Sequence, residues 1–198
     1  MDNRENILDV SLDLFYQKGY DAVSVQEIVE QAGVTKPTLY YYFGSKHGLL
    51  EALLENGFYN FNQYIEPALQ ESDADVRTVL FDVAKAFLSF VTTNYTFFSF
   101  MISLMYSPRE NEAYLTVKPY LHKLYRSIIN LFEREKQWLG NMNGRQEQFA
   151  MGFLGFLNQF AFTFLEKQYQ KGEAEVRASV TDEEVGAVVQ QFMYGIVS

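Results

Sequence analysis

The chain has 198 residues, of which 48% are hydrophobic and 17% aromatic, and its formal net charge at neutral pH is −9. This length allows one or two small domains, and so many aromatic side chains exclude a disordered chain. The absence of cysteine excludes disulfides, thiolate metal sites and cysteine nucleophiles. The opening sequence MDNRENILDV lacks the basic and apolar regions of a signal peptide, so we expect a cytoplasmic protein.

The first elements are two helices with clear start and stop signals. Apolar residues at helical spacing predict a helix over 3–18, which Gly19 ends. The run from Ser24 to Glu27 has the pattern of a capping box, so a second helix begins at Val25.

A short third helix follows after a turn. Gly33 turns the chain, Thr35 is a suitable N-cap, and the helix spans 36–43 with Pro37 in its first turn, where a missing N–H costs little. Ser45 then caps a fourth helix.

The remainder of the chain has longer helical patterns and no long alternating strand pattern. We therefore predict an all-α fold, with an N-terminal three-helix segment followed by a helical bundle. The expected later helices span 76–94, 96–107, 111–138, 145–171 and 182–197.

Two uncharged stretches raise the alternative of membrane spans, which need about 20 mostly apolar residues. The stretch 86–108 contains several Ser and Thr residues and Asn94, and the stretch 149–165 contains two Gly residues, Asn158 and Gln159. The mean hydropathy of the whole chain is −0.15. We interpret both stretches as buried helices of a soluble protein.

The short helix over 36–43 carries the strongest functional signal. Leu39 and Phe43 are four residues apart and face inward, whereas three consecutive tyrosines, at positions 40–42, cannot all be buried on so short a helix. At least one ring must be exposed, and contact with DNA would explain it. Recognition helices place their N-terminal residues at base edges, and hydroxyl and lysine side chains bind bases and phosphates.

The segment from Ile7 to Leu54 resembles the DNA-binding domain of the TetR/AcrR family of transcriptional regulators. It covers about a quarter of the chain, and the run GVTKPTLYYYFGSKHGLL is a specific signature. The matching residues occur in family order without gaps: Ile7, Leu8, Leu14, Phe15, Gly19, Tyr20, Ser24, Val25, Ile28, Ala32 to Thr35, Thr38 to Tyr40, Tyr42, Phe43, Lys46, Leu49 and Leu50.

The resemblance implies a role in DNA binding for ten residues and a helix-turn-helix domain over 1–47. The base-facing group comprises Lys36, Pro37, Thr38 and Tyr41 on the helix, and Thr35 at the N-cap is a further DNA-binding residue. The phosphate-binding group comprises Tyr40, Tyr42 and Lys46, with Ser24 and Gln26 contributing from the second helix.

The acidic charge of the chain is an objection to DNA binding, because phosphate contacts need basic surface. Residues 1–50 contain four basic and seven acidic side chains. However, residues 35–47 contain two lysines and one histidine and no acid. The surface formed by residues 35–47, which would contact DNA, is therefore weakly positive, and we expect a modest salt dependence of DNA binding.

The rest of the chain, 48–198, is expected to bind a ligand and form a homodimer, as the family resemblance implies. A dimer reads two half-sites of a pseudo-palindromic operator in double-stranded DNA. Apolar residues and small glycines on the last two helices supply a candidate interface, although packing inside the chain explains some of them equally well. The predicted interface residues are Phe149, Gly152, Phe153, Phe160, Val188 and Phe192.

The helices over 76–107 are rich in Phe and Met, which can line an apolar pocket. The resemblance implies a small hydrophobic effector whose binding releases the operator, so the protein is expected to be a repressor. A tightly filled core is the alternative explanation. The predicted ligand residues are Phe90, Phe98, Met101, Met105, Tyr125 and Phe156.

Two other classes of function compete with this interpretation. An enzyme is disfavoured because His47 and His122 are the only histidines, and no nucleophile, zinc or phosphate-loop motif occurs. We therefore expect no catalytic residue, metal or cofactor, and no membrane partner. A helical scaffold without DNA-binding function is disfavoured by the intact segment from Thr35 to Lys46.

Overall fold

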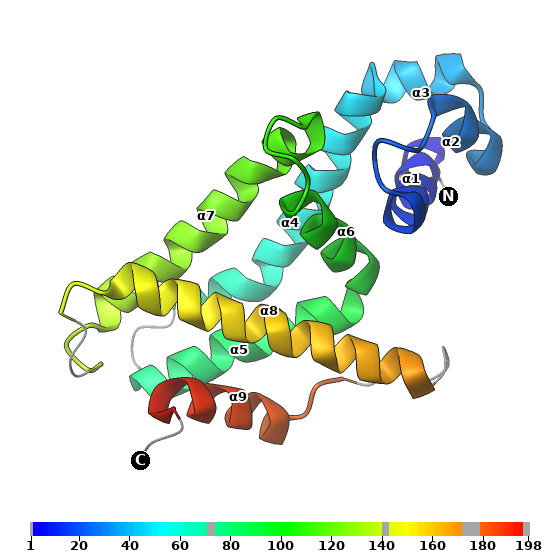
Figure 1. The fold of residues 1–198 in the computed structure, drawn as a ribbon. Coiled ribbons are helices and arrows are strands. Elements are labelled where there is room, and N and C mark those ends of the chain that lie inside the picture. The colour runs from blue at the N-terminus through cyan, green and yellow to red at the C-terminus, as the bar shows by residue number, and fades with distance from the viewer. Residues whose placement is uncertain (1, 71–73, 140–142, 172–178, 196–198) are drawn as a thin grey trace. The chain divides into compact units, whose positions relative to one another are not determined.

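The structure is a computed structural model that describes residues 2–70, 74–139, 143–171 and 179–195. Every regular element within these ranges is an α-helix, which confirms the predicted all-α fold (Figure 1). The helices are α1 (Asn3–Lys18), α2 (Val25–Ala32), α3 (Lys36–Phe43), α4 (Lys46–Gln70), α5 (Val76–Thr93), α6 (Tyr95–Met105), α7 (Glu112–Glu135), α8 (Gln146–Lys171) and α9 (Asp182–Tyr194).

The predicted helix ends agree with the structure to within a few residues. The largest differences are at the end of α7, which stops at Glu135 rather than at 138, and at the end of α9, which stops at Tyr194 with Gly195 as its C-cap rather than at 197. The final expected residues of the last helix, 196–197, lie outside the described residues. Helix α4 continues through Pro67 to Gln70.

Local capping explains where the N-terminal helices begin. The Ser24 hydroxyl accepts a hydrogen bond from the Glu27 amide at 3.2 Å, so one half of the expected capping box forms. The Glu27 carboxylate instead pairs with Lys18. Gly33 adopts the left-handed conformation (φ 65°, ψ 30°) that ends α2, and this turn sets the direction in which α3 begins.

The chain divides into two compact units, and the first comprises residues 1–60 and 96–120. It contains α1 to α3, the first part of α4, nearly all of α6 and the start of α7. This unit is larger than the predicted domain over 1–47 because residues distant in sequence complete its core. The ring of Phe15 stacks on that of Phe100, with centroids 5.7 Å apart.

Further aromatic contacts join α4 to α6 and α7 within the first unit. The Phe58 ring stacks on Tyr120, with centroids 4.6 Å apart, and meets the edge of Phe97 at 5.7 Å. Gly57 leaves room for this arrangement, because a Cβ atom there would lie 2.0 Å from the Phe97 ring. The close packing of α4 on α6 therefore depends on a glycine.

The second unit comprises residues 61–95 and 121–198. Within it α5 packs against α8 and α9, which also pack against each other. Phe192 on α9 lies against a cluster of rings, with its centroid 5.0 Å from Phe153 and 6.0 Å from Phe132. These contacts attach the short last helix to α7 and α8.

Polar contacts at helix ends add to the packing of the second unit. The Arg134 guanidinium donates to the Leu69 carbonyl at 2.7 Å, and its Nε donates to the buried Glu135 carboxylate at 2.6 Å. Lys85 and Asp182 form an ion pair at 2.7 Å, which joins α5 to the start of α9. The Thr181 capping box that opens α9 is fully formed, as predicted.

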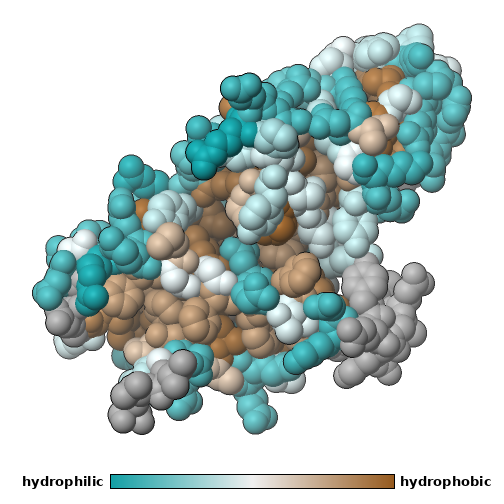
Figure 2. Space-filling model, viewed as in Figure 1, coloured by the Kyte–Doolittle hydropathy of each residue, from teal (hydrophilic) through white to brown (hydrophobic). Residues whose placement is uncertain are grey.

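Helix α8 is less buried than the sequence suggests. Its segment from Gln146 to Lys167 is long and apolar enough, by length and composition alone, to span a membrane. Only 33% of that window is buried inside the chain, so the expectation of a buried helix is wrong for α8 within one protomer. Figure 2 shows hydrophobic surface over this helix.

The connection between α3 and α4 is packed too closely to accept a side chain at Gly48. The Gly48 amide donates to the Ser45 hydroxyl at 2.9 Å, which confirms Ser45 as the cap of α4. A Cβ atom on Gly48 would lie 2.1 Å from the Phe43 carbonyl oxygen, and this backbone atom cannot move without shifting the end of α3.

We therefore predict that Gly48→Ala destabilises the protein by about 1–3 kcal/mol through this overlap. The matched control is Gly186→Ala on α9, where a Cβ would find only the Phe81 ring at 3.9 Å. This change should stabilise the protein by up to about 1 kcal/mol, because alanine favours helix over glycine. Urea unfolding measures both changes, and a Gly48→Ala variant as stable as the native chain would contradict the packing described.

Candidate nucleic-acid interface

Helix α3 is held by its two ends and by two buried side chains. The Thr35 hydroxyl accepts from the Thr38 amide at 3.4 Å and lies 2.8 Å from the Thr38 hydroxyl. Leu39 and Phe43 are buried against the core of the first unit, as their spacing predicts. The other faces of α3 are therefore available to contact another molecule.

The tyrosines of α3 differ in exposure. The side chain of Tyr41 is 83% exposed and that of Tyr40 is 46% exposed, whereas Tyr42 is half-buried. The Tyr41 and Tyr42 rings meet edge to face, with centroids 5.2 Å apart. The prediction that at least one ring is exposed is therefore confirmed, and Lys36 and Pro37 at the start of the helix are exposed as well.

The two predicted residues of α2 are also exposed. Ser24 uses a lone pair to cap α2, so its hydroxyl hydrogen remains available as a donor. The Gln26 side-chain amide donates to the Glu30 carboxylate. Ser24 and Gln26 thus lie in solvent, with Gln26 already engaged by its own helix.

Lys46 differs from the other predicted residues because its ammonium group faces the protein. Its Nζ donates to the Tyr20 carbonyl at 2.5 Å and lies 4.2 Å from the centroid of the Tyr20 ring. Phe15 supplies a second ring, at 5.8 Å. Burial lowers the pKa of Lys46, and the nearby carboxylates of Asp21 and Glu112 act in the opposite direction.

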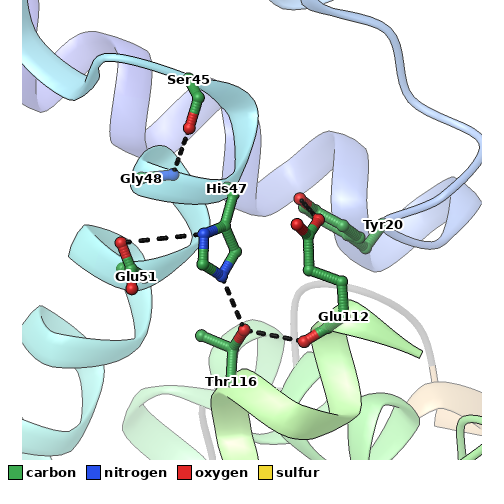
Figure 3. A network of polar contacts seen from close by, with 7 residues as sticks. All are labelled: Tyr20, Ser45, His47, Gly48, Glu51, Glu112 and Thr116. Atoms are coloured by element: carbon green, nitrogen blue, oxygen red, sulfur yellow. Dashed lines mark hydrogen bonds and ion pairs between the residues drawn. The ribbon is translucent and has the colours of Figure 1, made fainter. Parts of the chain in front are cut away.

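Tyr20 is in turn bonded to the first turn of α7. Its hydroxyl donates to the Glu112 carboxylate at 2.9 Å, and Figure 3 shows the two side chains next to each other. Burial raises the pKa of Tyr20, and the hydrogen bond to Glu112 and the charges of Glu112 and Asp21 raise it further. The phenol is therefore a neutral donor over the whole physiological range.

Two more hydrogen bonds join the start of α7 to the N-terminal helices. The Asn111 amide donates to the Asp21 carboxylate at 2.7 Å. His47 Nε2 lies 3.0 Å from the Thr116 hydroxyl, which itself donates to the Glu112 carbonyl at 2.7 Å (Figure 3). Because a hydroxyl has one hydrogen, His47 is the donor to Thr116.

These contacts were missed by sequence reasoning. Tyr20 and Glu112 are 92 positions apart, and neither spacing nor composition links them. The only sequence signal was the position of Tyr20 within the family-like segment. The polar contacts of Tyr20, Asp21 and His47 with α7 form the second half of this site.

The predicted ligand residues are divided between the two compact units. Phe98, Met101 and Met105 belong to the first unit, and Phe90, Tyr125 and Phe156 belong to the second. Phe90, Phe98 and Met101 are buried, and Met105 and Tyr125 are partly buried. Phe156 is 42% exposed and contacts Phe192, so it lies with the surface residues of α8 rather than in a core.

The predicted interface residues fall into two groups. Phe149, Gly152, Phe160 and Phe192 are partly exposed, whereas Phe153 and Val188 are buried within the chain. Phe153 and Val188 can therefore support an interface but can bury no further area in one. Sequence reasoning missed the most exposed apolar side chains of α8, which are Met151 (62%) and Phe162 (61%).

No group of three or more histidine and acidic side chains that could hold a metal ion occurs among the described residues.

Comparison with known proteins places the N-terminal segment in a known group. Residues 7–53 match the model described as bacterial regulatory proteins, tetR family. The chain is 34% identical over 94 residues to the HTH-type transcriptional repressor ComR of Escherichia coli K12, a match that covers 48% of this chain and 45% of that protein. The chain thus matches less than half the length of this curated relative.

Solved structures resemble the chain over nearly its whole length. The fatty acid degradation regulator FadR from Bacillus halodurans superimposes with a TM-score of 0.75 at 18% identity, covering 99% of this chain and 97% of that one. AibR, solved in complex with isovaleryl coenzyme A and operator DNA, gives a TM-score of 0.70 at 20% identity, covering 97% and 98%. At these identities the likeness establishes the fold.

Proposed function

We propose that this chain, which belongs to the TetR family of bacterial regulatory proteins, is a dimeric repressor that binds a pseudo-palindromic operator and releases it when a small hydrophobic effector binds. The observation that carries the proposal is the exposure of Tyr41 on α3, beside Lys36, Pro37 and Thr38. An aromatic side chain that is 83% exposed adds nothing to the core, and the only ring contact described for Tyr41 is its edge contact with the neighbouring Tyr42.

In this proposal α3 enters the major groove with its N-terminal end toward the bases. Lys36 and Thr38 donate to base edges, and the Pro37 ring and the Thr38 methyl group can pack on a thymine methyl. Tyr41 reaches the bases from the middle of the helix. The phosphates are bound by Tyr40, Tyr42, Ser24, Gln26 and Lys46. Thr35 caps the end of α3 that faces the bases.

The acidic charge of the chain is compatible with this mode of binding. Both acids of the neighbouring helix α2 are occupied: Glu27 pairs with Lys18, and Glu30 accepts from Gln26. Few phosphates are neutralised by each subunit, so the affinity for DNA should fall only modestly as salt rises.

We predict that the full chain selects a pseudo-palindromic sequence from a random DNA pool. Tyr41→Ala and Lys36→Ala should each weaken binding to the selected sequence by about 1–3 kcal/mol, the usual cost of removing a side chain that binds a base. Tyr59→Ala on α4 is the control, because Tyr59 is exposed outside α2 and α3. Fluorescence anisotropy measures all four proteins.

Selection of no sequence, or equal binding by the Tyr41→Ala variant and the native chain, would favour the alternative of a helical protein without DNA-binding function. Weakening by Tyr59→Ala of the same size would show that the effect is not specific to α3.

The exposed face of α8 supports a dimer. Met151 and Phe162 are more than half exposed, and Gly155 has open space where a side chain would extend. A long apolar helix that is only one-third buried needs a partner, and a second copy supplies the same face in a two-fold interface. Phe149, Gly152, Phe160 and Phe192 border this face, and Phe153 and Val188 support it from inside.

We predict that Gly155→Leu and Met151→Glu convert the dimer to monomers. The leucine fits the isolated protomer, because nothing lies within 4 Å of a Cβ at Gly155, but it prevents two helices from approaching closely. Leu115→Glu, another change at an exposed apolar position, should leave the dimer intact. Analytical ultracentrifugation distinguishes these results, and dimers of both α8 variants would refute the assignment.

The effector site is proposed at the predicted ligand residues of the first compact unit, Phe98, Met101 and Met105. Phe98 and Met101 are buried and Met105 is partly buried, which fits a hydrophobic ligand. AibR was solved with isovaleryl coenzyme A, so acyl thioesters and free fatty acids of increasing length are suitable probes.

We predict that one of these probes lowers operator affinity by about 5- to 150-fold, the range of common allosteric couplings. By thermodynamic linkage, operator DNA must lower the affinity for that probe by the same factor. Isothermal calorimetry with and without operator tests this equality. A probe that binds equally well to the free and the DNA-bound protein would contradict release by an effector.

A further inference from the structure

We propose that Tyr20 and Glu112 are positioning residues for DNA binding, which together hold the ammonium group of Lys46 where it binds a backbone phosphate. The inference rests on the proposed function and extends it to a residue of α7, outside the helix-turn-helix segment. All the contacts that carry it lie within the first compact unit.

The Lys46 side chain is ordered by three contacts before any DNA is present. Its ammonium group donates to the Tyr20 carbonyl at 2.5 Å and lies over the Tyr20 ring at 4.2 Å, while the Phe15 ring is 5.8 Å away. Tyr20 follows Gly19, the residue that ends α1, so this carbonyl belongs to the turn between α1 and α2.

The ammonium group still has capacity for a phosphate. It carries three N–H donors, and the Tyr20 carbonyl accepts from one of them. Lys46 is half-buried rather than enclosed, so solvent reaches the group. Holding the Tyr20 carbonyl and binding a phosphate are therefore compatible, and a lysine already held in place loses less side-chain freedom when DNA binds.

Glu112 fixes the ring of Tyr20. Its carboxylate accepts from the Tyr20 hydroxyl at 2.9 Å, and its carbonyl accepts from Thr116, the residue that His47 contacts (Figure 3). Asn111 accepts a hydrogen bond from the Ala113 amide at 2.8 Å through its side chain, which caps α7. The start of α7 thus holds the Tyr20 ring in place, and Tyr20 in turn holds the Lys46 ammonium group.

The charges around Lys46 support the same role. Asp21 and Glu112 both favour the protonated ammonium group and oppose the effect of burial. Asp21 is itself held by the Asn111 amide at 2.7 Å. The start of α7 therefore helps to keep Lys46 both in place and charged.

The test is a double-mutant cycle with Tyr20→Phe and Lys46→Met in the full chain, with Tyr59→Phe as the matched control. Tyr20→Phe removes only the hydroxyl and keeps the ring and the carbonyl, and it changes no charge. Each protein is titrated with the selected operator and with a scrambled duplex at several salt concentrations. Thermal unfolding and sedimentation confirm that each variant is folded and has the native oligomeric state.

Lys46→Met should weaken operator binding by about tenfold, as expected for a charge-assisted hydrogen bond. It should also reduce the salt slope by about one unit for each phosphate that the variant no longer binds. Tyr20→Phe should weaken binding by about threefold in the presence of Lys46, because the lysine becomes less ordered. Tyr20→Phe should weaken binding to the scrambled duplex by the same factor, since phosphates carry no sequence information. In the Lys46→Met background, Tyr20→Phe should have no effect.

Glu112 is tested by comparing Glu112→Gln with Glu112→Ala. Both changes remove the negative charge, so the difference between them isolates the hydrogen bond to Tyr20, which the glutamine oxygen can still accept. The glutamine variant should bind DNA about threefold more tightly than the alanine variant, through the same ordering of Lys46. The two variants should be equal when Lys46 is replaced by methionine.

Three results would overturn the proposal. Equal weakening by Tyr20→Phe in both backgrounds would make Tyr20 a purely structural residue. Tighter binding by Tyr20→Phe would mean that the Tyr20 side chain keeps Lys46 away from DNA. A Lys46→Met variant that binds like the native chain would show that Lys46 binds no phosphate. By contrast, failure of the native chain to bind any DNA would refute the proposed function as well.

Discussion

Helix α3 is too short to be stable alone, and this constraint governs the N-terminal half of the molecule. Isolated helices below about 12–15 residues are marginal in water, and α3 has eight. Its stability must come from Leu39 and Phe43, which insert into the core, from the N-cap at Thr35, and from the Gly44 amide, which donates to the Tyr40 carbonyl. With only these anchors, most of the helix surface remains free to contact another molecule.

The same requirement explains why the first compact unit extends beyond the N-terminal helices. The core of the first unit includes Phe15, and the Phe15 ring stacks in turn on Phe100 of α6. Polar contacts add to this apolar one, because Asn111 donates to Asp21, Tyr20 donates to Glu112 and His47 donates to Thr116. The segment proposed to bind DNA is thereby attached to residues near the middle of the chain.

Features set by neighbouring residues could be predicted from the sequence, and features set by distant residues could not. The caps at Thr35, Ser45 and Thr181 depend on residues three positions away, and the structure has them. The exposure of at least one of the three tyrosines followed from counting the inward positions of one short helix, but which ring is most exposed did not. The hydrogen bonds from Lys46 to Tyr20 and from Tyr20 to Glu112 depend on tertiary packing, and no local sequence pattern predicts them.

Burial of α8 shows the same limit. Its composition indicated an apolar helix correctly, but composition cannot say which face packs inside the chain and which remains exposed. Phe153 and Val188 turned out to be internal, whereas Met151 and Phe162 are on the surface.

The single measurement that tests the account most directly is a crystal structure of the full chain bound to its selected operator. The account predicts Tyr41 at base edges in the major groove, with Lys46 bonded to both a phosphate and the Tyr20 carbonyl. A complex in which α3 lies outside the groove, or in which Lys46 contacts no phosphate, would contradict it.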